Sequence, residues 1–117
     1  MKDFRKLMVW QEAHQITLEL YPITQKFPVE ERYGLTSQIR RSSASIGATI
    51  AEGCGKGSEV EFCRFLQMSG GSASELAYHL ILARDLGYLS AAQFVDLSMR
   101  TEAVQKMLAS LISKIFG

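Results

Sequence analysis

Apolar residues recur at alternating spacings of three and four along almost the whole chain, in four segments separated by short breaks. The first segment carries the series Val9, Ala13, Ile16, Leu20, Ile23 and Phe27. Such spacing places residues on one face of an α-helix, whereas a half-buried strand would alternate apolar and polar residues. No alternating stretch of useful length occurs. The pattern therefore predicts four helices, over residues 7–26, 30–54, 59–86 and 91–116.

Signals for helix ends fall at the breaks in this pattern. Ser58 is followed three residues later by Glu61, and Ser90 by Gln93, which is the capping-box arrangement of a helix start. The glycine-rich run 53–57 is typical of a helix stop.

Two residues interrupt the predicted helices. Pro22 lacks a backbone N–H and crowds residue 18, so we expect a kink or an early end near Tyr21. Gly34 is a candidate break near the start of the second helix.

Small residues form two further groups. Ala44, Ala48, Ala51 and Gly55 step by four, three and four along the second predicted helix. The run 69–74, Ser-Gly-Gly-Ser-Ala-Ser, has low helix propensity and would also suit a linker. The apolar register passes through it in phase, so we interpret it as helix. We expect this run to pack closely against the alanine row.

These elements predict an all-α fold, a single domain over residues 1–117 arranged as an antiparallel up-down-up-down four-helix bundle. A chain of 117 residues with 47% hydrophobic residues can form a stable core without disulfides or bound metal ions. The net charge of +1 restricts any contact with nucleic acid to a local basic patch.

The chain has no predicted membrane segment, because Arg84-Asp85 cuts short the longest apolar run and the start lacks a signal-peptide pattern. Cys54 and Cys63 are expected to be reduced thiols. We therefore expect a cytoplasmic protein with no membrane partner.

Residues able to support catalysis are few. His14 and His79 are expected to be packing or hydrogen-bonding residues, and a Cys63–His79 nucleophilic pair would need a meeting across helices. Glu75 and His79 are four residues apart, whereas di-iron bundles use Glu-x-x-His on two helices. The run 53–58 lacks the spacing of a phosphate loop and follows a helix rather than a strand. We expect no catalytic residue, no cofactor and no metal site, and no enzymatic activity.

Basic residues are the best candidates for a functional site. The candidate phosphate contacts are Arg40, Arg41, Lys56 and Arg64. Hydroxyl groups that can contact phosphates surround the arginine pair, at Ser37, Ser42, Ser43 and Ser45. No aromatic residue is interleaved, so we expect backbone contacts rather than base stacking. Two alternatives stay open: a solvated face with ordinary ion pairs to glutamates, and subunit contacts made by the arginines.

Several apolar residues lie off the predicted core faces: Tyr33, Phe65, Met68, Tyr78 and Met99. Apolar side chains in such positions are expected to be buried between protomers.

Several motifs together resemble the "four helix bundle protein" family, whose members include proteins encoded in intervening sequences of bacterial 23S ribosomal RNA genes. The matching motifs are Val9-Trp10-Gln11-Glu12-Ala13, Phe27-Pro28-x-Glu30-Glu31-x-Tyr33-Gly34-Leu35, Gln38-Ile39-Arg40-Arg41, Ser45-Ile46, Ile50-Ala51-Glu52-Gly53, Gly71-Ser72-x-x-Glu75-Leu76 and Leu86-Gly87-Tyr88-Leu89. They cover nearly the whole chain in the right order. The chain departs from the family pattern at Gly47-Ala48-Thr49, where members usually show Pro-x-Asn.

The family looks like a relative of the accessory variability determinant protein of diversity-generating retroelements. The resemblance implies a homopentamer of four-helix protomers, and the retroelement relative is thought to engage nucleic acid and the reverse transcriptase. The leading hypothesis is a non-enzymatic accessory protein that binds the backbone of RNA or an RNA–DNA intermediate. The rival is a scaffold or adaptor that binds a protein partner and has no nucleic-acid role.

Overall fold

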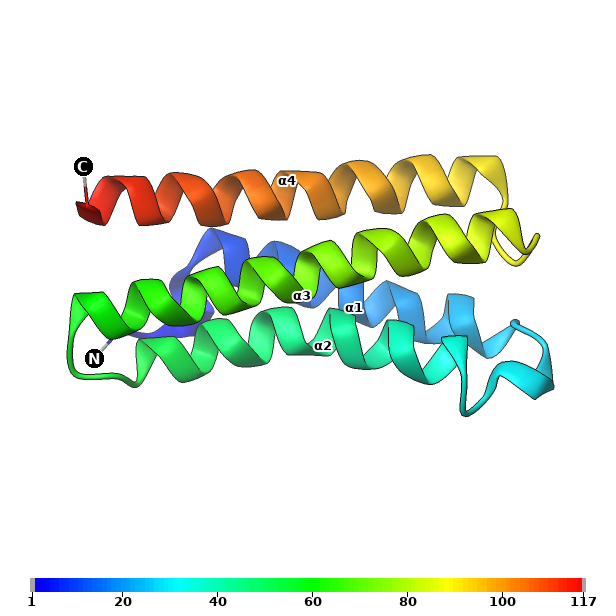
Figure 1. The fold of residues 1–117 in the computed structure, drawn as a ribbon, viewed down its shortest axis with the longest axis horizontal. Coiled ribbons are helices and arrows are strands. Elements are labelled where there is room, and N and C mark those ends of the chain that lie inside the picture. The colour runs from blue at the N-terminus through cyan, green and yellow to red at the C-terminus, as the bar shows by residue number, and fades with distance from the viewer. Residues whose placement is uncertain (1, 117) are drawn as a thin grey trace.

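The computed structural model describes residues 2–116, which form four long α-helices lying side by side (Figure 1). They are α1 (Met8–Gln25), α2 (Leu35–Cys54), α3 (Glu59–Asp85) and α4 (Ala91–Phe116). Two short 3-10 helices, η1 (Phe4–Lys6) and η2 (Val29–Glu31), precede α1 and α2, and residues 2–116 contain no β-strand. The long dimension of 43 Å is close to the length of about 40 Å that a 27-residue helix spans. The predicted all-α fold of four helices is confirmed.

Short connections join consecutive helices. In Figure 1 the α1–α2 and α3–α4 connections lie at one end of the molecule, and the α2–α3 connection lies at the other. α2 and α3 share the most extensive contact, while α1 and α4 meet over a smaller area. Within residues 2–116, α2 and α4 do not approach each other.

The core consists of the residues that the three-four spacing predicts. Fully buried side chains come from all four helices and include Ile16, Leu20, Ile39, Ile46, Leu66, Leu76, Leu80, Val104 and Leu108. They form one cluster, which Leu89 from the α3–α4 connection joins. Burial of each such aliphatic side chain stabilises the fold by about 1.5–3 kcal/mol relative to leaving the side chain in water.

The predicted start of α3 is confirmed in part and that of α4 in full. The Ser58 hydroxyl accepts from the Glu61 N–H at 3.1 Å, but the Glu61 carboxylate binds Arg64 instead of completing the box. At Ser90 both bonds form, because its hydroxyl accepts from the Gln93 N–H at 3.1 Å and its N–H donates to Gln93 Oε1 at 2.9 Å.

Of the kink or early end expected near Tyr21, the early end does not occur. α1 continues through Pro22 to Gln25. Pro22 is exposed and stands in the last turn. Its missing N–H would have bonded to the carbonyl of Leu18, a residue that is itself exposed, so water can take its place.

The second helix begins later than predicted. Residues 29–31 form η2, helical structure is interrupted at Gly34 as the sequence suggested, and α2 begins only at Leu35. The Glu31 carboxylate then accepts from the Leu35 N–H at 3.1 Å and caps the new helix start.

Run 69–74 is helical, but it does not pack against the alanine row as expected. The Ser69 hydroxyl donates to the Ile46 carbonyl at 2.9 Å, and the hydroxyls of Ser72 and Ser45 are 2.9 Å apart. α3 therefore contacts α2 on the face that carries Ser45. The alanine row instead faces Phe4, Trp10, His14 and Thr17 across a groove of about 360 Å³.

α2 and α3 approach each other closely at Gly53. A Cβ placed on Gly53 would lie 2.7 Å from the Cβ of Phe65. A Cβ on Gly70 or Gly71 would meet no atom within 4 Å. Hydroxyl groups rather than glycines therefore join run 69–74 to α2.

Candidate nucleic-acid interface

Arg40 and Arg41 point in different directions from α2. Arg40 is half-buried and turns toward α1, where its Nε donates to Thr24 Oγ1 at 2.9 Å and its Nη2 donates to the Tyr21 carbonyl at 3.1 Å. Arg41 is exposed and lines a separate groove between α2 and α3. This divergence follows from the 100° step between adjacent helical residues.

The groove beside Arg41 has a volume of about 390 Å³ and is mostly polar. Glu75 lines the same groove, yet its carboxylate does not come within ion-pair distance of Arg41. His79 is buried at the groove, with its Nδ1 3.4 Å from the hydroxyl of Ser42. His79 is therefore a buried hydrogen-bonding residue, as predicted.

The neighbouring serines are less available than the sequence suggested. Ser42 and Ser43 are buried, and their hydroxyls donate to the backbone carbonyls of Gln38 and Arg40 at 2.9 and 3.1 Å. Ser45 bonds Ser72 across the α2–α3 contact. Back-bonding within the helix satisfies the hydroxyls of Ser42 and Ser43, and Ser72 engages that of Ser45, so a phosphate would have to compete with these bonds.

Lys56 and Arg64 come together at the other end of α2. Both cations lie over the ring of Phe65, at 5.0 and 4.8 Å from its centroid. Arg64 also holds Glu61 through two bonds of 2.9 and 3.1 Å, and this hydrogen bonding lowers the pKa of the Glu61 carboxyl. Phe65 is itself buried, so the expectation that it lies between protomers is wrong.

The four predicted residues do not form one patch. Arg41 and Lys56 are 15 positions apart along the direction of α2, which corresponds to about 22 Å at 1.5 Å per residue. A nucleic-acid strand would have to run along the helix to reach both groups.

Ion pairing separates the arginines of the chain into two classes. Arg5, Arg64, Arg84 and Arg100 each have a carboxylate within 4 Å. Within residues 2–116 no carboxylate comes this close to the other three, Arg32, Arg40 and Arg41, which all lie near the start of α2. Sequence reasoning missed Arg32 because it lies in the connection, outside any helical stripe.

Two tyrosines accompany these arginines in space, although no aromatic residue is interleaved with Arg40 and Arg41 in the sequence. Arg40 lies 4.6 Å from the ring centroid of Tyr21, and Arg32 lies 5.9 Å from that of Tyr33. Tyr33 is 88% exposed. Exposed aromatic rings beside guanidinium groups are the arrangement on which nucleic-acid bases stack.

The remaining chemistry of the described residues is sparse. Both thiols are free and buried, and burial raises the pKa of Cys54 and of Cys63. Among residues 2–116 no three His, Cys, Asp or Glu side chains gather closely enough to hold a metal ion. In the same part of the chain, every helix is too short or too polar to span a bilayer.

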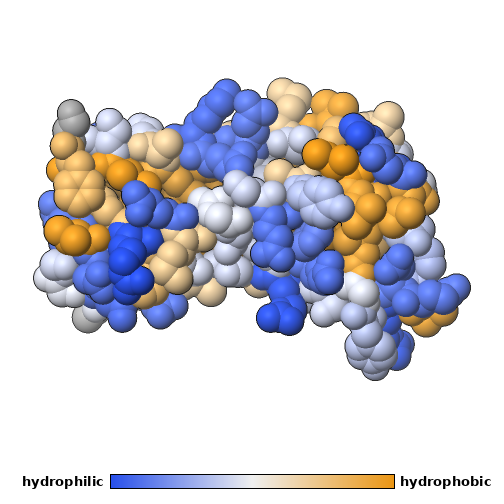
Figure 2. All heavy atoms as spheres, viewed as in Figure 1, coloured by the Kyte–Doolittle hydropathy of each residue, from blue (hydrophilic) through white to orange (hydrophobic). Residues whose placement is uncertain are grey.

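Apolar side chains are also exposed on the surface. Figure 2 shows hydrophilic residues across the middle of one face and hydrophobic residues toward both ends. Of the residues predicted to lie off the core, Tyr33, Met68, Tyr78 and Met99 are exposed in the protomer.

Comparison with known proteins identifies a family and related solved structures. Residues 5–110 match the family described as 23S rRNA-intervening sequence protein. A crystal structure of a protein with unknown function, from the S23 ribosomal protein family of Bacteroides thetaiotaomicron, superposes with a TM-score of 0.83. Its sequence is 24% identical, and the alignment covers 90% of this chain and 98% of that chain, so the likeness concerns the fold. No curated protein sequence matches the chain.

Proposed function

The chain belongs to the 23S rRNA-intervening sequence protein family, and from this premise we propose that it is a non-enzymatic accessory protein that binds the backbone of RNA or an RNA–DNA intermediate. Its protomer is an antiparallel up-down-up-down bundle, and five protomers assemble in the cytoplasm. Arg40 and Arg41 contact phosphates at one end of α2, and Lys56 and Arg64 do so at the other.

The three arginines without a carboxylate partner carry this proposal. A carboxylate partner, such as Glu61 beside Arg64, offsets the positive charge that an arginine offers to a phosphate. Arg32, Arg40 and Arg41 have no such contact within residues 2–116. In the proposed ring of five protomers these three arginines would be repeated five times. The ring would then have a positive potential that one chain of net charge +1 does not have.

Charge reversal at the arginine pair tests the proposal. We expect Arg40→Glu/Arg41→Glu to abolish retention on heparin and on a nucleic-acid filter, while circular dichroism shows unchanged helicity. The matched control is Lys106→Glu/Lys114→Glu, which changes the net charge equally on α4, far along the chain from α2. We expect this control to keep most of the binding, and unchanged retention of the arginine variant would reject the proposal.

A protein scaffold is the second candidate, and a specific groove favours it. The groove has a volume of about 400 Å³ and lies between the start of α1 and the end of α4. Leu7, Met8, Val9, Met107 and Leu111 give it apolar walls, and Lys106 and Lys114 stand at its edge. Purified protein that carries no nucleic acid, and whose weak nucleic-acid binding does not change with salt, would favour this candidate.

A further inference from the structure

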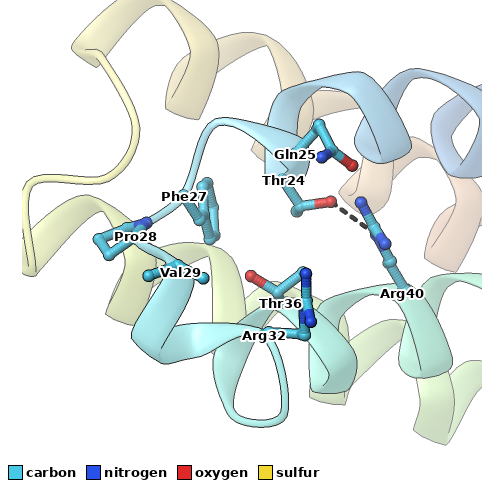
Figure 3. A pocket seen from close by; sticks show the side chains of 8 residues that line it. All are labelled: Thr24, Gln25, Phe27, Pro28, Val29, Arg32, Thr36 and Arg40. Carbon is cyan, nitrogen blue, oxygen red and sulfur yellow. Dashed lines mark hydrogen bonds between the residues drawn. The ribbon is translucent and has the colours of Figure 1, made fainter.

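A pocket of about 280 Å³ lies where the end of α1, the 3-10 helix η2 and the start of α2 meet (Figure 3). Its lining residues are Thr24, Gln25, Phe27, Pro28, Val29, Arg32, Thr36 and Arg40, of which none is acidic. A pocket of this volume has room for several water molecules, which is ample for a phosphate group.

Arg40 is held in place at one wall of this pocket. Figure 3 shows its guanidinium reaching Thr24, to which Nε donates at 2.9 Å, and Nη2 donates to the carbonyl of Tyr21. These bonds use two of the five N–H groups of the guanidinium and leave three for a ligand. Because the side chain is already fixed, a ligand would not have to immobilise it on binding.

Arg32 adds a second positive charge that no acidic group neutralises. Its neighbour Glu31 is occupied elsewhere, because its Oε1 accepts from the Leu35 N–H and its Oε2 accepts from the Tyr88 hydroxyl at 3.0 Å. Within residues 2–116 neither Arg32 nor Arg40 has a carboxylate within 4 Å. Two like charges that share a pocket repel each other until an anion enters.

The start of α2 contributes a hydroxyl group to the pocket. Thr36 lines the pocket from the first turn of this 20-residue helix, next to the Leu35 N–H that Glu31 already caps. Thr36 is only 7% exposed, and its hydroxyl makes no hydrogen bond with the described residues. At the end of α1, by contrast, the carbonyl of Tyr21 is already covered by Arg40.

We propose that this pocket binds a phosphate monoester, namely the terminal phosphate of a nucleic-acid strand or of a nucleotide. A monoester carries about −1.5 to −2 charges near neutral pH and presents three terminal oxygens. A phosphodiester inside a strand carries one negative charge. Two guanidinium groups and a hydroxyl match the monoester in both charge and number of donors. The inference rests on the proposed function, because Arg40 serves both, and it adds selectivity for strand ends.

Three RNA oligonucleotides of one sequence, labelled internally, test the inference by fluorescence anisotropy. One carries a 5′-phosphate, one a 3′-phosphate, and one hydroxyl groups at both ends. We expect one of the phosphorylated strands to bind about tenfold more tightly than the hydroxyl strand, as the loss of a charged hydrogen-bonding partner costs of this order. Equal affinity for the three strands would overturn the inference.

Two variants locate the effect. Arg32 is exposed, so Arg32→Gln leaves the fold intact, and we expect it to remove the preference for the phosphorylated strand. Arg41→Gln removes the same charge outside the pocket. We expect it to weaken all three strands alike and to keep the preference. A preference that survives Arg32→Gln would place the phosphate elsewhere and overturn the inference.

Calorimetry with adenosine monophosphate separates this inference from the proposed function. If the mononucleotide binds wild type but not Arg32→Gln, and no oligonucleotide binds, the pocket recognises free nucleotides and the proposed function fails. If the three oligonucleotides bind equally with a steep salt dependence, and the mononucleotide does not bind, the proposed function stands and the pocket inference fails.

Discussion

Glu19 and Arg100 join α1 to α4 through a two-point contact between a guanidinium and a carboxylate. The two N–H···O distances are 2.9 and 2.6 Å, and Asp96 adds a third contact to Arg100 at 3.3 Å. The hydrogen bond from Arg100 lowers the pKa of the Glu19 carboxyl below its ordinary value. Glu19 is 47% exposed, so water screens the pair.

The contribution of this pair to stability should depend on pH. A carboxyl whose pKa is lowered in the folded state stabilises the fold above its unfolded pKa, near 4.3, and loses that effect as the pH falls through the folded pKa. We therefore expect Arg100→Gln to lower the free energy of unfolding by about 1 kcal/mol at pH 7. Urea unfolding at pH 7 and at pH 3 measures the difference, which should shrink in acid.

Glu19→Gln is the matched variant for this prediction. It removes the same contact from the other side and leaves Asp96 with Arg100. We expect Glu19→Gln also to lower the free energy of unfolding at pH 7. The double variant should lose less than the sum of the two single losses, because both substitutions remove the same interaction. An equal loss at both pH values would show that the pair does not act through its charge.

Individual residues also mark the limit of what the sequence predicts about the candidate site. Arg40 and Arg41 could be identified from their type, but their directions depend on Thr24 and on the groove beside Glu75, residues distant in the chain. Arg32 has no local signal at all. Its lack of a carboxylate partner follows from Glu31 turning to Leu35 and Tyr88.

At the scale of one element, α3 contains two glycines in mid-helix without a packing reason for either. A Cβ on Gly71 would meet no atom within 4 Å, and the residue is exposed. We expect Gly71→Ala to raise the free energy of unfolding by up to about 1 kcal/mol, because alanine loses less backbone entropy in a helix. Denaturant unfolding followed by circular dichroism gives the value.

Gly53→Ala in α2 is the contrasting variant. Its Cβ would lie 2.7 Å from the Cβ of Phe65, which cannot move without its backbone. We expect this overpacking to lower the free energy of unfolding by about 1–3 kcal/mol, although Gly71→Ala exchanges the same residue types and is expected to raise it. A destabilised Gly71→Ala together with a neutral Gly53→Ala would contradict the described α2–α3 contact.

The elements themselves were largely predictable, and their mutual contacts were not. Three-four spacing gave each helix and its buried face to within a few residues, apart from the start of α2, where Glu31 caps a helix that begins after Gly34. The spacing could not show which side of α2 meets run 69–74. Ser42 and Ser45 have helical spacing as the alanine row does, and the bond from the Ser69 hydroxyl to the Ile46 carbonyl decides between the two faces.

At the scale of the whole molecule, exposed apolar residues support assembly into oligomers. Tyr33, Met68, Tyr78 and Met99 lie on the protomer surface. We expect native mass spectrometry at micromolar concentration to give five times the 13.1 kDa of one chain. Because apolar burial is not screened by salt, the oligomer should persist at high ionic strength. A mass of a single chain under these conditions would reject the proposed assembly.

Unequal contacts between the helices set the order in which we expect the bundle to open. Segments with few tertiary contacts unfold locally at a lower free-energy cost than the rest. α2 and α3 share the most extensive contact, whereas α1 and α4 each have less contact with the rest of the bundle. We therefore expect α1 and α4 to loosen first, and α2 and α3, joined by serine hydroxyls, to separate last.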